Sequence, residues 1–247
     1  MLLEGKTSVI TGCLQGIGRA TLDIFAENGA DVFACSQIET DEFSKHILLL
    51  QERFGVEVIP IYFDLSDESS IKKAARAIQQ RKKRVDVLVN IAGMTEDALF
   101  EMVTMEQLHQ IFDINFFSQI MFTQYIVKIM KKYGEGSVIN ISSISALDGN
   151  PGQLAYASSK AAWIAATKTM SAELGPKGIR VNAVAPGVIA SGMTEHLPTE
   201  TLDRHMARSS IKRMGLPSEV ANAIMYLASD LSSFVTGQTI RVDGGIG

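Results

Sequence analysis

Seven short runs rich in β-branched and other apolar residues recur along the chain, and longer stretches with helical periodicity separate them. Strands that alternate with helices are joined by right-handed crossovers, which place the strands side by side and parallel in one covered sheet. The pattern therefore predicts an α/β fold with a doubly wound, seven-stranded, mostly parallel sheet and helices on both faces. The runs lie at residues 7–11, 31–35, 56–63, 85–90, 137–142, 179–185 and 238–243.

The stretches between these runs carry helix signals. Apolar residues in the segment 71–78 recur on one helical face. Thr104 and Gln107 have the spacing of a capping box that opens a helix. No linker, repeat or low-complexity tract interrupts the alternation, so we expect residues 1–247 to form one domain. Its site should lie in the loops at the carboxyl ends of the strands.

The composition is ordinary for a globular protein, with 46% hydrophobic and 20% charged residues and a formal net charge of −4. An acidic chain has no global field that attracts nucleic acid or an anionic membrane. The first residues contain too short an apolar run for a secretory signal. The longest apolar stretch, 111–130, is interrupted by Asp113 and Lys128, so we expect a helix buried against protein. These features predict a cytoplasmic protein with neither nucleic acid nor membrane as a partner.

The chain contains two cysteines, Cys13 and Cys35, which cannot form a disulfide framework. We expect both to be small buried side chains in a reducing compartment. The four histidines are scattered without ligand spacing, so we expect no metal site.

The sequence TGCLQGIG at 11–18 lies between the first strand and the first helix. Gly12, Gly16 and Gly18 leave room for a ligand close to the backbone. The helix that begins near Ile17 directs free N–H groups and its positive dipole end at a phosphate. A glycine-rich turn that packs a helix on a strand is the alternative, but the position after a first strand favours a dinucleotide site.

A second candidate site is the sequence YASSK, in which Tyr156 and Lys160 lie on one helical face. Ser143 directly follows a strand, and Asn115 lies within a helical segment, where a polar side chain is unfavourable. Each residue alone also has an ordinary interpretation: Lys160 as a surface charge, Ser143 as a turn hydroxyl and Asn115 as a buried cap.

Taken together, these residues resemble the short-chain dehydrogenase/reductase family, and the resemblance covers essentially the whole chain. The stretches GNPGQLAYASSKAA, GIRVNAVAPG and FVTGQTIRVDGG are most similar to 3-oxoacyl-[acyl-carrier-protein] reductases, although sugar, polyol and steroid dehydrogenases share them. The matching motifs are T-G-x-x-x-G-I-G at 11–18, N-x-A-G at 90–93, Asn115, Ser143, Tyr156, Lys160 and P-G at 186–187.

The resemblance implies a Rossmann domain that transfers a hydride between NAD(P)(H) and a carbonyl carbon. Tyr156 would exchange the proton, and a neighbouring ammonium and the charged nicotinamide can lower the pKa of a tyrosine by about 1–3 units. Ser143 would hold the carbonyl oxygen. Lys160 would activate Tyr156 and hold the ribose, and Asn115 would hold a water that relays protons to Lys160.

The resemblance also implies residues that bind the cofactor and the substrate. The cofactor residues are Gly12, Leu14, Gln15, Gly16, Ile17, Gly18, Ser36, Gln37, Asp64, Leu65, Asn90, Ala92, Gly93, Tyr156, Lys160, Pro186, Gly187, Ile189 and Ser191. The substrate would contact Ser143, Gln153 and Tyr156, in a pocket lined by Met94, Ile144, Asn150, Gln153 and Val188.

The chain departs from the family pattern in three places. Residues 13–15 read Cys-Leu-Gln where Ala-Ser-Arg is common, and Ile91 replaces a second asparagine. Gly134 stands where carrier-protein reductases often have an arginine for docking the acidic carrier, although Lys177 keeps a second basic position. The first two bear on cofactor choice, and the third bears on the carrier protein.

The cofactor preference depends on opposing features. NAD-preferring proteins have an acidic residue at the end of the second strand, where this chain has Ser36 and Gln37. Its absence permits the 2′-phosphate of NADP(H), but Gln15 cannot supply the charge-assisted bond of an arginine. We expect NADP(H) to be favoured and NAD(H) to be possible.

The preferred substrate is a 3-oxoacyl thioester, small or carried by acyl carrier protein, which would place the enzyme in fatty acid biosynthesis. The alternatives are a sugar, polyol or other secondary-alcohol dehydrogenase and, more remotely, a non-catalytic nucleotide-binding protein. We expect residues 191–216 to form a lid over the substrate; the alternative is an ordinary surface segment without that role. The family usually forms homotetramers, and we expect the subunit interfaces at the helical segments 111–130 and 155–175. The alternative is that these helices are buried within one subunit.

Overall fold

The computed structural model describes residues 1–192, 194, 202 and 206–246. Seven strands form one sheet in the order β3-β2-β1-β4-β5-β6-β7, and all six neighbouring pairs are parallel. The prediction of a doubly wound α/β fold is therefore confirmed. The strands are β1 (Thr7–Thr11), β2 (Asp31–Ser36), β3 (Val58–Tyr62), β4 (Val87–Asn90), β5 (Gly136–Ile141), β6 (Ile179–Pro186) and β7 (Thr239–Val242).

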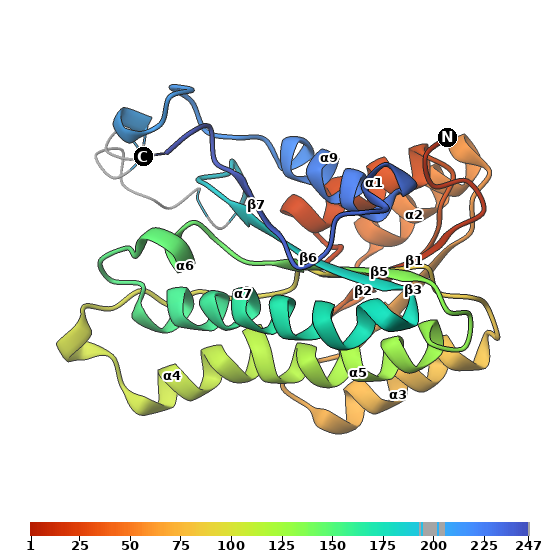
Figure 1. Ribbon diagram of the computed structural model, residues 1–247, viewed down its shortest axis with the longest axis horizontal. Coiled ribbons are helices and arrows are strands. Elements are labelled where there is room, and N and C mark those ends of the chain that lie inside the picture. The colour runs from red at the N-terminus through yellow and green to blue at the C-terminus, as the bar shows by residue number, and fades with distance from the viewer. Residues whose placement is uncertain (193, 195–201, 203–205, 247) are drawn as a thin grey trace.

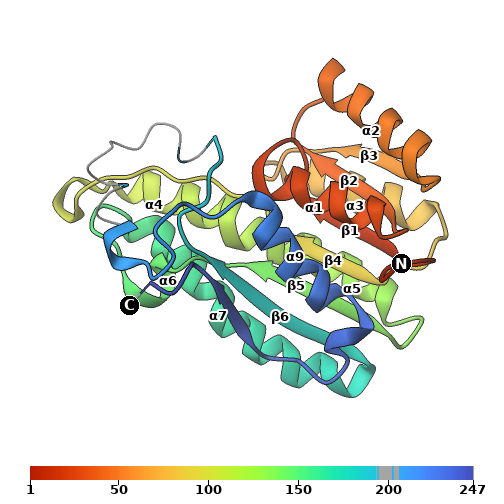
Figure 2. The same ribbon diagram turned by 90° about the horizontal axis from the view of Figure 1, so that it is seen from above.

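Helices cover both faces of the sheet (Figure 1; Figure 2). The α-helices are α1 (Gly16–Glu27), α2 (Asp41–Phe54), α3 (Glu68–Gln80), α4 (Met105–Phe112), α5 (Ser118–Met130), α6 (Ser145–Asp148), α7 (Leu154–Leu174) and α9 (Pro217–Ala228). Shorter helical segments are η1 (Phe100–Met102), η2 (Asp113–Phe117), η3 (Gly175–Lys177) and η4 (Asp230–Ser232).

The core lies in two layers, one on each face of the sheet. Helices α1, α2 and α9 pack on one face, where Phe25 and Phe43 are fully buried. Helices α3, α5 and α7 pack on the other, where Phe122 is fully buried. Burial of β-branched side chains on both faces explains why the central strands have continuous apolar sequences.

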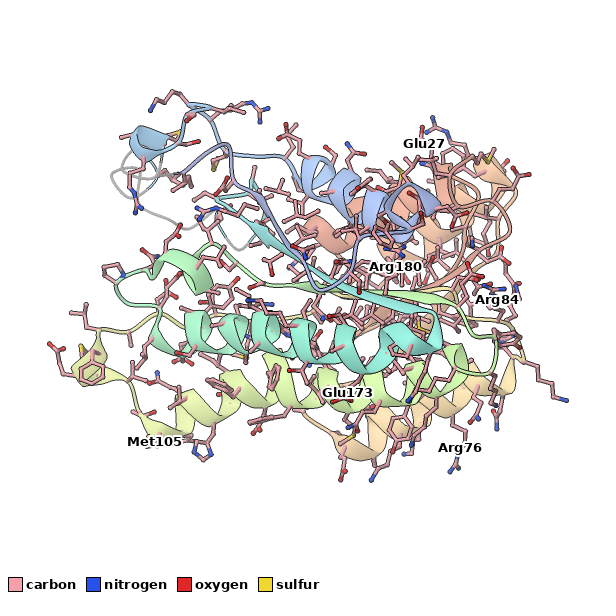
Figure 3. All side chains as sticks on the ribbon, viewed as in Figure 1. Glu27, Arg76, Arg84, Met105, Glu173 and Arg180 are labelled. Atoms are coloured by element: carbon pink, nitrogen blue, oxygen red, sulfur yellow. The ribbon has the colours of Figure 1, made fainter. Side chains whose placement is uncertain are left out.

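The helix signals of the sequence are found in the structure. The apolar face of α3 is buried, as the periodicity of residues 71–78 predicts. Thr104 Oγ1 accepts a bond from the Gln107 backbone N–H at 3.1 Å, and Gln107 Oε1 accepts one from the Thr104 N–H at 2.9 Å, which completes the capping box. Met105 follows at the start of α4, where its side chain is 65% exposed (Figure 3).

The helical segment that spans residues 105–130 is not a regular α-helix. Between α4 and α5 the chain forms one turn of π-helix, η2, which contains the buried Asn115. A π-helical turn frees backbone carbonyls from their usual partners, and such turns are often found at functional sites. No helix in the described ranges is long and apolar enough to cross a bilayer.

Candidate active site

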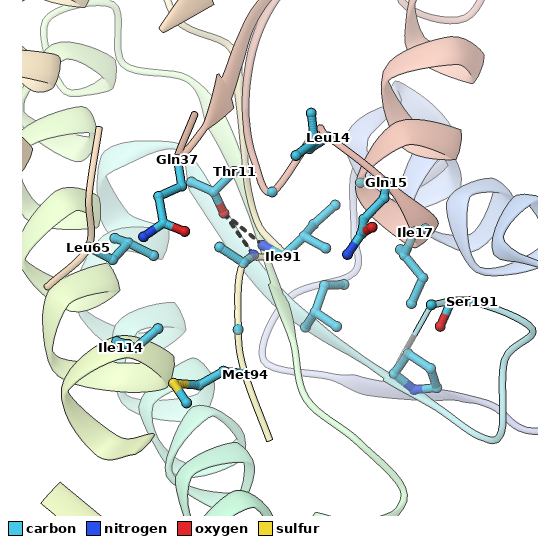
Figure 4. A pocket seen from close by; sticks show the side chains of 18 of the residues that line it. Thr11, Leu14, Gln15, Ile17, Gln37, Leu65, Ile91, Met94, Ile114 and Ser191 are labelled. Atoms are coloured by element: carbon cyan, nitrogen blue, oxygen red, sulfur yellow. Dashed lines mark hydrogen bonds between the residues drawn. The ribbon is translucent and has the colours of Figure 1, made fainter. Parts of the chain in front are cut away.

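A cavity of about 520 Å³ lies at the carboxyl ends of the strands, where the loops after β1 and β4 diverge (Figure 4). Strand order reverses between β1 and β4, which is where ligands bind in open α/β sheets. The loops after β1 to β6 all contribute to its wall.

The glycine-rich loop has a conformation that other residues would not tolerate. Gly12 has φ +76°, and a Cβ there would lie 3.1 Å from the backbone of Ala92. A Cβ at Gly18 would lie 1.9 Å from the Gly12 carbonyl oxygen. Helix α1 begins directly after this loop, and the side chain of its N-cap, Gln15, forms no capping bond. The free N–H groups of the first turn therefore face the cavity without a side-chain partner, an arrangement that fits a pyrophosphate.

Thr11 connects the first and fourth strands at this point, which the sequence analysis missed. Its hydroxyl accepts bonds from the backbone N–H groups of Ile91 at 2.9 Å and Ala92 at 3.1 Å (Figure 4). The hydroxyl also donates to the Val89 carbonyl oxygen at 3.4 Å. A threonine directly before the glycine loop was the available sequence signal. Its bonds hold the glycine loop against the loop that contains Ile91 and Ala92.

The end of β2 presents polar groups to the cavity. The Ser36 hydroxyl donates to the Ile38 carbonyl oxygen at 2.9 Å, and Gln37 Nε2 donates to Asp64 at 3.4 Å. Ser66 donates to Asp64 from its backbone N–H and its hydroxyl, at 2.8 Å each. These bonds stabilise the carboxylate and lower the pKa of Asp64. The rim therefore combines neutral donors with one fixed negative charge.

Lys160 lies on α7 below the ring of Tyr156, with its Nζ 5.9 Å from the ring centroid. Lys160 is 3% exposed, and its ammonium donates to the Ile141 carbonyl oxygen at 2.9 Å. Burial lowers the pKa of Lys160 to about 8, because the charged form loses its hydration. The Ser142 hydroxyl donates to the Lys160 carbonyl oxygen at 2.8 Å and fixes this turn of α7 to the end of β5.

The pKa of Tyr156 differs from the sequence-based expectation. Burial raises the pKa of the Tyr156 phenol, a bond with Ser143 lowers it, and the carboxylate of Asp97 raises it further. The expected lowering by Lys160 therefore does not dominate, because desolvation of the phenolate is the largest effect. The expected lowering of the Tyr156 pKa also included the positive charge of a bound nicotinamide, which these three effects do not contain.

Ser143 follows β5 and accepts a bond at 3.2 Å from the backbone N–H of Ser145. Because the serine oxygen accepts this bond, its own hydrogen remains available to donate. Ser143 therefore has the geometry of a donor aimed at the phenol of Tyr156 or at a substrate oxygen beside it.

Asn115 is completely buried in the π-helical turn and connects α7 to the loop after β4. Its Oδ1 accepts a bond from the Met94 backbone N–H at 2.8 Å. Its Nδ2 donates to the Met94 carbonyl oxygen at 2.9 Å and to the Ser159 hydroxyl at 3.1 Å. Asn115 lies within a helical segment, as the sequence indicates, and its amide anchors the cavity wall next to Lys160.

Two further side chains, which the sequence analysis did not single out, bond to the main chain of Asn115. Trp163 Nε1 donates to the Asn115 carbonyl oxygen at 2.8 Å, and Gln119 Nε2 donates to the same oxygen at 3.1 Å. Gln119 also donates to the Ala92 carbonyl oxygen at 2.7 Å. The π-helical turn therefore has its freed carbonyl satisfied from α5 and α7.

The structure brings most of the predicted cofactor residues to one cavity; the exception is Asn90. Asn90 is buried just below the cavity, where its Nδ2 donates to Thr123 and to Asn140, both at 2.9 Å. Asn115 and Gln153 lie behind or beside the lining. The lining residues among the predicted ones are Gly12, Leu14, Gln15, Gly16, Ile17, Gly18, Ser36, Gln37, Asp64, Leu65, Ala92, Gly93, Ser143, Tyr156, Lys160, Pro186, Gly187, Ile189 and Ser191.

The predicted substrate pocket is less complete. Met94 lines the cavity, whereas Ile144, Asn150 and Val188 are not among its lining residues. The predicted lid, 191–216, falls partly outside the described residues. Among the described residues, no group of three or more potential metal-ligating side chains is present.

A doubly wound sheet, a glycine loop at its switch point and a Tyr-Lys pair beside the same cavity define a nucleotide-dependent oxidoreductase. A family model described as "Enoyl-(Acyl carrier protein) reductase" matches residues 12–247. A solved structure described as a short-chain dehydrogenase/reductase family protein has a TM-score of 0.87 at 32% identity and covers 99% of this chain. The chain belongs to the short-chain dehydrogenase/reductase family, whose members are NAD(P)-dependent oxidoreductases.

Curated relatives and further solved structures match over the full length. A 3-oxoacyl-[acyl-carrier-protein] reductase of Thermotoga maritima is 43% identical over 250 residues, which cover 100% of this chain and 99% of the relative. A putative NAD(P)-dependent gluconate 5-dehydrogenase from Beutenbergia cavernae, solved with bound NADP, has a TM-score of 0.92 at 31% identity and covers 98% and 96% of the two chains. A 3-oxoacyl-[acyl-carrier protein] reductase from Brucella melitensis has a TM-score of 0.91 at 31% identity and covers 99% and 92%.

Proposed function

We propose that the protein is an NADPH-preferring reductase of 3-oxoacyl thioesters, with acyl carrier protein as the physiological carrier. The observation that carries the proposal is the position of Ser143, Tyr156 and Lys160 beside the cavity that the glycine loop opens. Full-length identity of 43% to a 3-oxoacyl-[acyl-carrier-protein] reductase supports the substrate class.

The cavity fits a nicotinamide dinucleotide. Its glycine loop excludes side chains where a pyrophosphate would approach, and α1 directs its first N–H groups at the same place. The pyrophosphate would be held by the glycine loop 12–18, and the nicotinamide ribose by Tyr156 and Lys160. The adenosine would be held by Ser36, Gln37, Asp64 and Leu65. When bound, the reduced nicotinamide supplies a hydride to the carbonyl carbon of the substrate.

The remaining steps belong to the side chains. Ser143 donates a hydrogen bond to the carbonyl oxygen and stabilises the charge that develops there. Tyr156 transfers its phenolic proton to that oxygen, so that a new C–H bond and a new O–H bond complete the alcohol. Lys160 stabilises the resulting phenolate. A phenol with a raised pKa retains its proton at neutral pH until the substrate oxygen takes it, which suits the reductive direction.

We propose that Asn115 positions a water that returns a proton to Lys160. A Cβ added to Gly93 would lie 3.2 Å from Asn115 Oδ1 and 3.3 Å from Lys160 Nζ, so both groups face the space beside this glycine. Asn115 Oδ1 accepts one protein bond and retains a second lone pair. A water between the two groups would therefore have an acceptor and a donor.

A basic surface supports docking of an acidic carrier. Lys131, after α5, and Lys177, in η3, lie close enough that Lys177 lowers the pKa of Lys131. Two ammonium groups that repel each other are stabilised by an anionic partner. Gly134 lies in the same region, next to Gly178, and a side chain there would meet no heavy atom within 4 Å. Gly134 has a φ of +68°, a left-handed conformation that strains any other residue, so this turn favours glycine even though space for an arginine exists.

The cofactor preference that we propose is modest. The end of β2 itself has no carboxylate, since Ser36 and Gln37 lie there, but the Asp64 carboxylate is bonded to Gln37 and weakens the attraction for a 2′-phosphate. The Ser36 hydrogen is already donated to Ile38 and one Gln37 hydrogen to Asp64, which leaves the second Gln37 hydrogen and the backbone as donors. The structural relative with bound NADP is consistent with this assignment.

A second candidate function is the oxidation of a polyol or sugar acid. The specific observation in its favour is the TM-score of 0.92 to the putative gluconate 5-dehydrogenase. The deciding experiment follows nicotinamide absorbance with acetoacetyl-CoA, diketones, polyols and gluconate, each with NADPH or NADP⁺ and with NADH or NAD⁺. Preferential reduction of acetoacetyl-CoA with NADPH supports the proposal, and turnover of gluconate alone supports the second candidate.

We further propose that residues 1–247 act as one domain with a lid at 191–216, and that the protein is a cytoplasmic homotetramer. Exposed apolar residues on the α4–α5 segment support a subunit interface there, including Met105 at 65% and Phe117 at 55% exposure. Sedimentation analysis gives the oligomeric state, and a monomer would contradict this assembly.

A further inference from the structure

Asp97 lies in the loop that follows β4, three residues after Met94, which lines the cavity. Its neighbour Ala98 donates from its backbone N–H to the Gly152 carbonyl oxygen at 2.9 Å, and Ala98 pairs with Gln153 in an isolated parallel bridge. Gln153 is the N-cap of α7, and Tyr156 lies in the first turn of that helix. The backbone contact therefore holds the Asp97 loop against the start of the helix that supplies the proposed proton donor.

The side chain of Asp97 is part of a short, oriented network. The Thr95 hydroxyl donates to Asp97 Oδ1 at 2.7 Å, and Gln153 Nε2 lies 3.4 Å and 3.3 Å from the two carboxylate oxygens. The Ser145 hydroxyl donates to Gln153 Oε1 at 2.8 Å. The Asp97 carboxylate accepts from the amide nitrogen of Gln153, and the Ser145 hydroxyl donates to its amide oxygen, so the two bonds fix the orientation of this amide.

The charge of Asp97 is not neutralised by these contacts. Its hydrogen-bond partners in the described part of the chain, Thr95 and Gln153, are both neutral donors. Its negative charge reaches Tyr156, since the carboxylate contributes to the raised pKa of the phenol. The cation on the other side, Lys160, is buried under the ring and is bonded to the Ile141 carbonyl oxygen. A substrate beside Tyr156 is therefore exposed to the negative charge of Asp97, whereas the Lys160 ammonium is buried behind the phenol.

We propose that Asp97 determines specificity by rejecting carbonyl compounds that carry a carboxylate near the reacting carbon, so that the site selects uncharged thioesters and esters. This inference rests on the proposed function and narrows it: a 3-oxoacyl group is uncharged as a thioester and anionic as the free acid. The same charge disfavours keto sugar acids. Asp97 acts through its charge and through Gln153, and it exchanges no proton with the substrate.

The expected size of the effect follows from Coulomb's law. We take the Asp97 carboxylate and a substrate carboxylate to be about 6 Å apart, with an effective dielectric of about 40 between protein surface and water. Their repulsion then amounts to about 1.4 kcal/mol, which lowers kcat/KM by about tenfold. The measurement compares methyl acetoacetate with acetoacetate, which share the reacting carbonyl and differ in a single charge. The ratio of their kcat/KM values cancels any general effect of a variant on activity.

The test uses Asp97→Asn, which is isosteric and still accepts a bond from Thr95. Its matched control is Glu96→Gln, one residue away, because Glu96 accepts a bond from Gln107 of α4 at 2.6 Å instead of bonding to Gln153. Asp97→Asn should lower the preference for the methyl ester by about five- to tenfold at low salt, with a smaller change at 0.5 M salt. Glu96→Gln should change the preference by less than about twofold. Thermal melting of both variants shows whether the fold is preserved.

The outcomes separate the two levels of the proposal. If the wild type reduces methyl acetoacetate and Asp97→Asn leaves the preference unchanged, Asp97 does not determine specificity, although the proposed function stands. An equal change in both variants also overturns the assignment, since it would be a general surface-charge effect. If the wild type reduces neither compound nor acetoacetyl-CoA, the proposed function and this inference both fail.

Discussion

At the scale of single residues, the proposed chemistry depends on two groups whose environments oppose their charged forms. Burial raises the pKa of Tyr156 and lowers that of Lys160 to about 8, so desolvation disfavours the charged form of each group. At pH 7 the tyrosine is a neutral phenol and the lysine is still mainly an ammonium, which can stabilise the phenolate after proton transfer. The two groups make different predictions.

Tyr156→Phe removes one oxygen and no cofactor contact other than that oxygen. Turnover of acetoacetyl-CoA should fall by about 10²–10⁴, as is typical when a general acid is lost. Binding of NADPH, measured by fluorescence titration, should change by less than about threefold. A variant that keeps more than a tenth of the wild-type turnover would falsify the assignment of Tyr156.

We expect Lys160→Met to lower the activity and to raise the stability of the cofactor-free protein. A lysine whose pKa is about 8 in the folded protein and near 10.5 in the unfolded chain binds fewer protons when folded. Its burial therefore costs stability below pH 8, and that cost disappears as pH rises from 8 to 10.5. The cofactor-free variant should be more stable than the wild type by about 1–2 kcal/mol at pH 7, after the lost bond to Ile141 is allowed for.

The measurement is urea unfolding of both proteins between pH 7 and pH 10. The stability difference should shrink as the pH rises, while NADPH binding and turnover of the variant are weakened at every pH. A constant difference across this range would show that the Lys160 ammonium is not the source of the cost.

At the scale of secondary-structure elements, the sequence predicted the regular parts and missed the irregular one. Each predicted strand lies within about two residues of its observed bounds, because β-branched runs between helical segments carry a strong periodic signal. The π-helical turn at Asn115 has no such signal. It depends on side-chain bonds from α5 and α7, which only the tertiary structure reveals.

The candidate site also has a part that the sequence predicted and a part that only the structure reveals. The glycine loop and the Tyr156–Lys160 pair have local spacing, so the family pattern predicted them. Thr11 belongs to the glycine-loop motif, but its bonds to the loop after β4 could not be read from that motif. Trp163 and Asp97 also act through contacts with residues far away in the chain, and no short motif marks them. The sign of the Tyr156 pKa shift also could not be predicted, because it depends on burial.

Trp163 gives a prediction for the π-helical element. Trp163→Phe removes the indole N–H that bonds to the Asn115 carbonyl oxygen but keeps an aromatic ring against Phe116, whose centroid lies 5.3 Å away. Loss of one buried bond should destabilise the protein by about 1–3 kcal/mol. Because Asn115 is positioned through this turn, kcat should fall more than KM rises.

Chemical unfolding and steady-state kinetics with acetoacetyl-CoA check both parts of this prediction. Trp163→Leu serves for comparison, since it removes the ring as well as the donor. Equal loss of stability in the two variants, with kcat unchanged in Trp163→Phe, would mean that Trp163 contributes packing alone.

At the scale of the whole molecule, the cavity and the basic surface lie at different places on the sheet. The cavity is at the carboxyl ends of the strands, whereas Lys131 and Lys177 flank the amino-terminal ends of β5 and β6. A carrier protein that delivered a substrate from this surface would need to reach around the subunit or serve the cavity of a neighbouring subunit. The proposed tetramer makes the second route possible, so carrier docking and assembly are linked in one prediction.

Lys177→Glu should raise KM for carrier-bound 3-oxoacyl substrate by about three- to tenfold, because it replaces an attraction by a repulsion at the edge of the contact. KM for acetoacetyl-CoA should stay within about twofold. The difference should shrink as salt rises above physiological strength, where the Debye length is about 8 Å.

Lys45→Glu is the matched control, since Lys45 is an exposed lysine on α2, which covers the other face of the sheet. If both lysine variants raise KM equally, net charge rather than a docking surface explains the effect, and the small-alcohol alternative gains support.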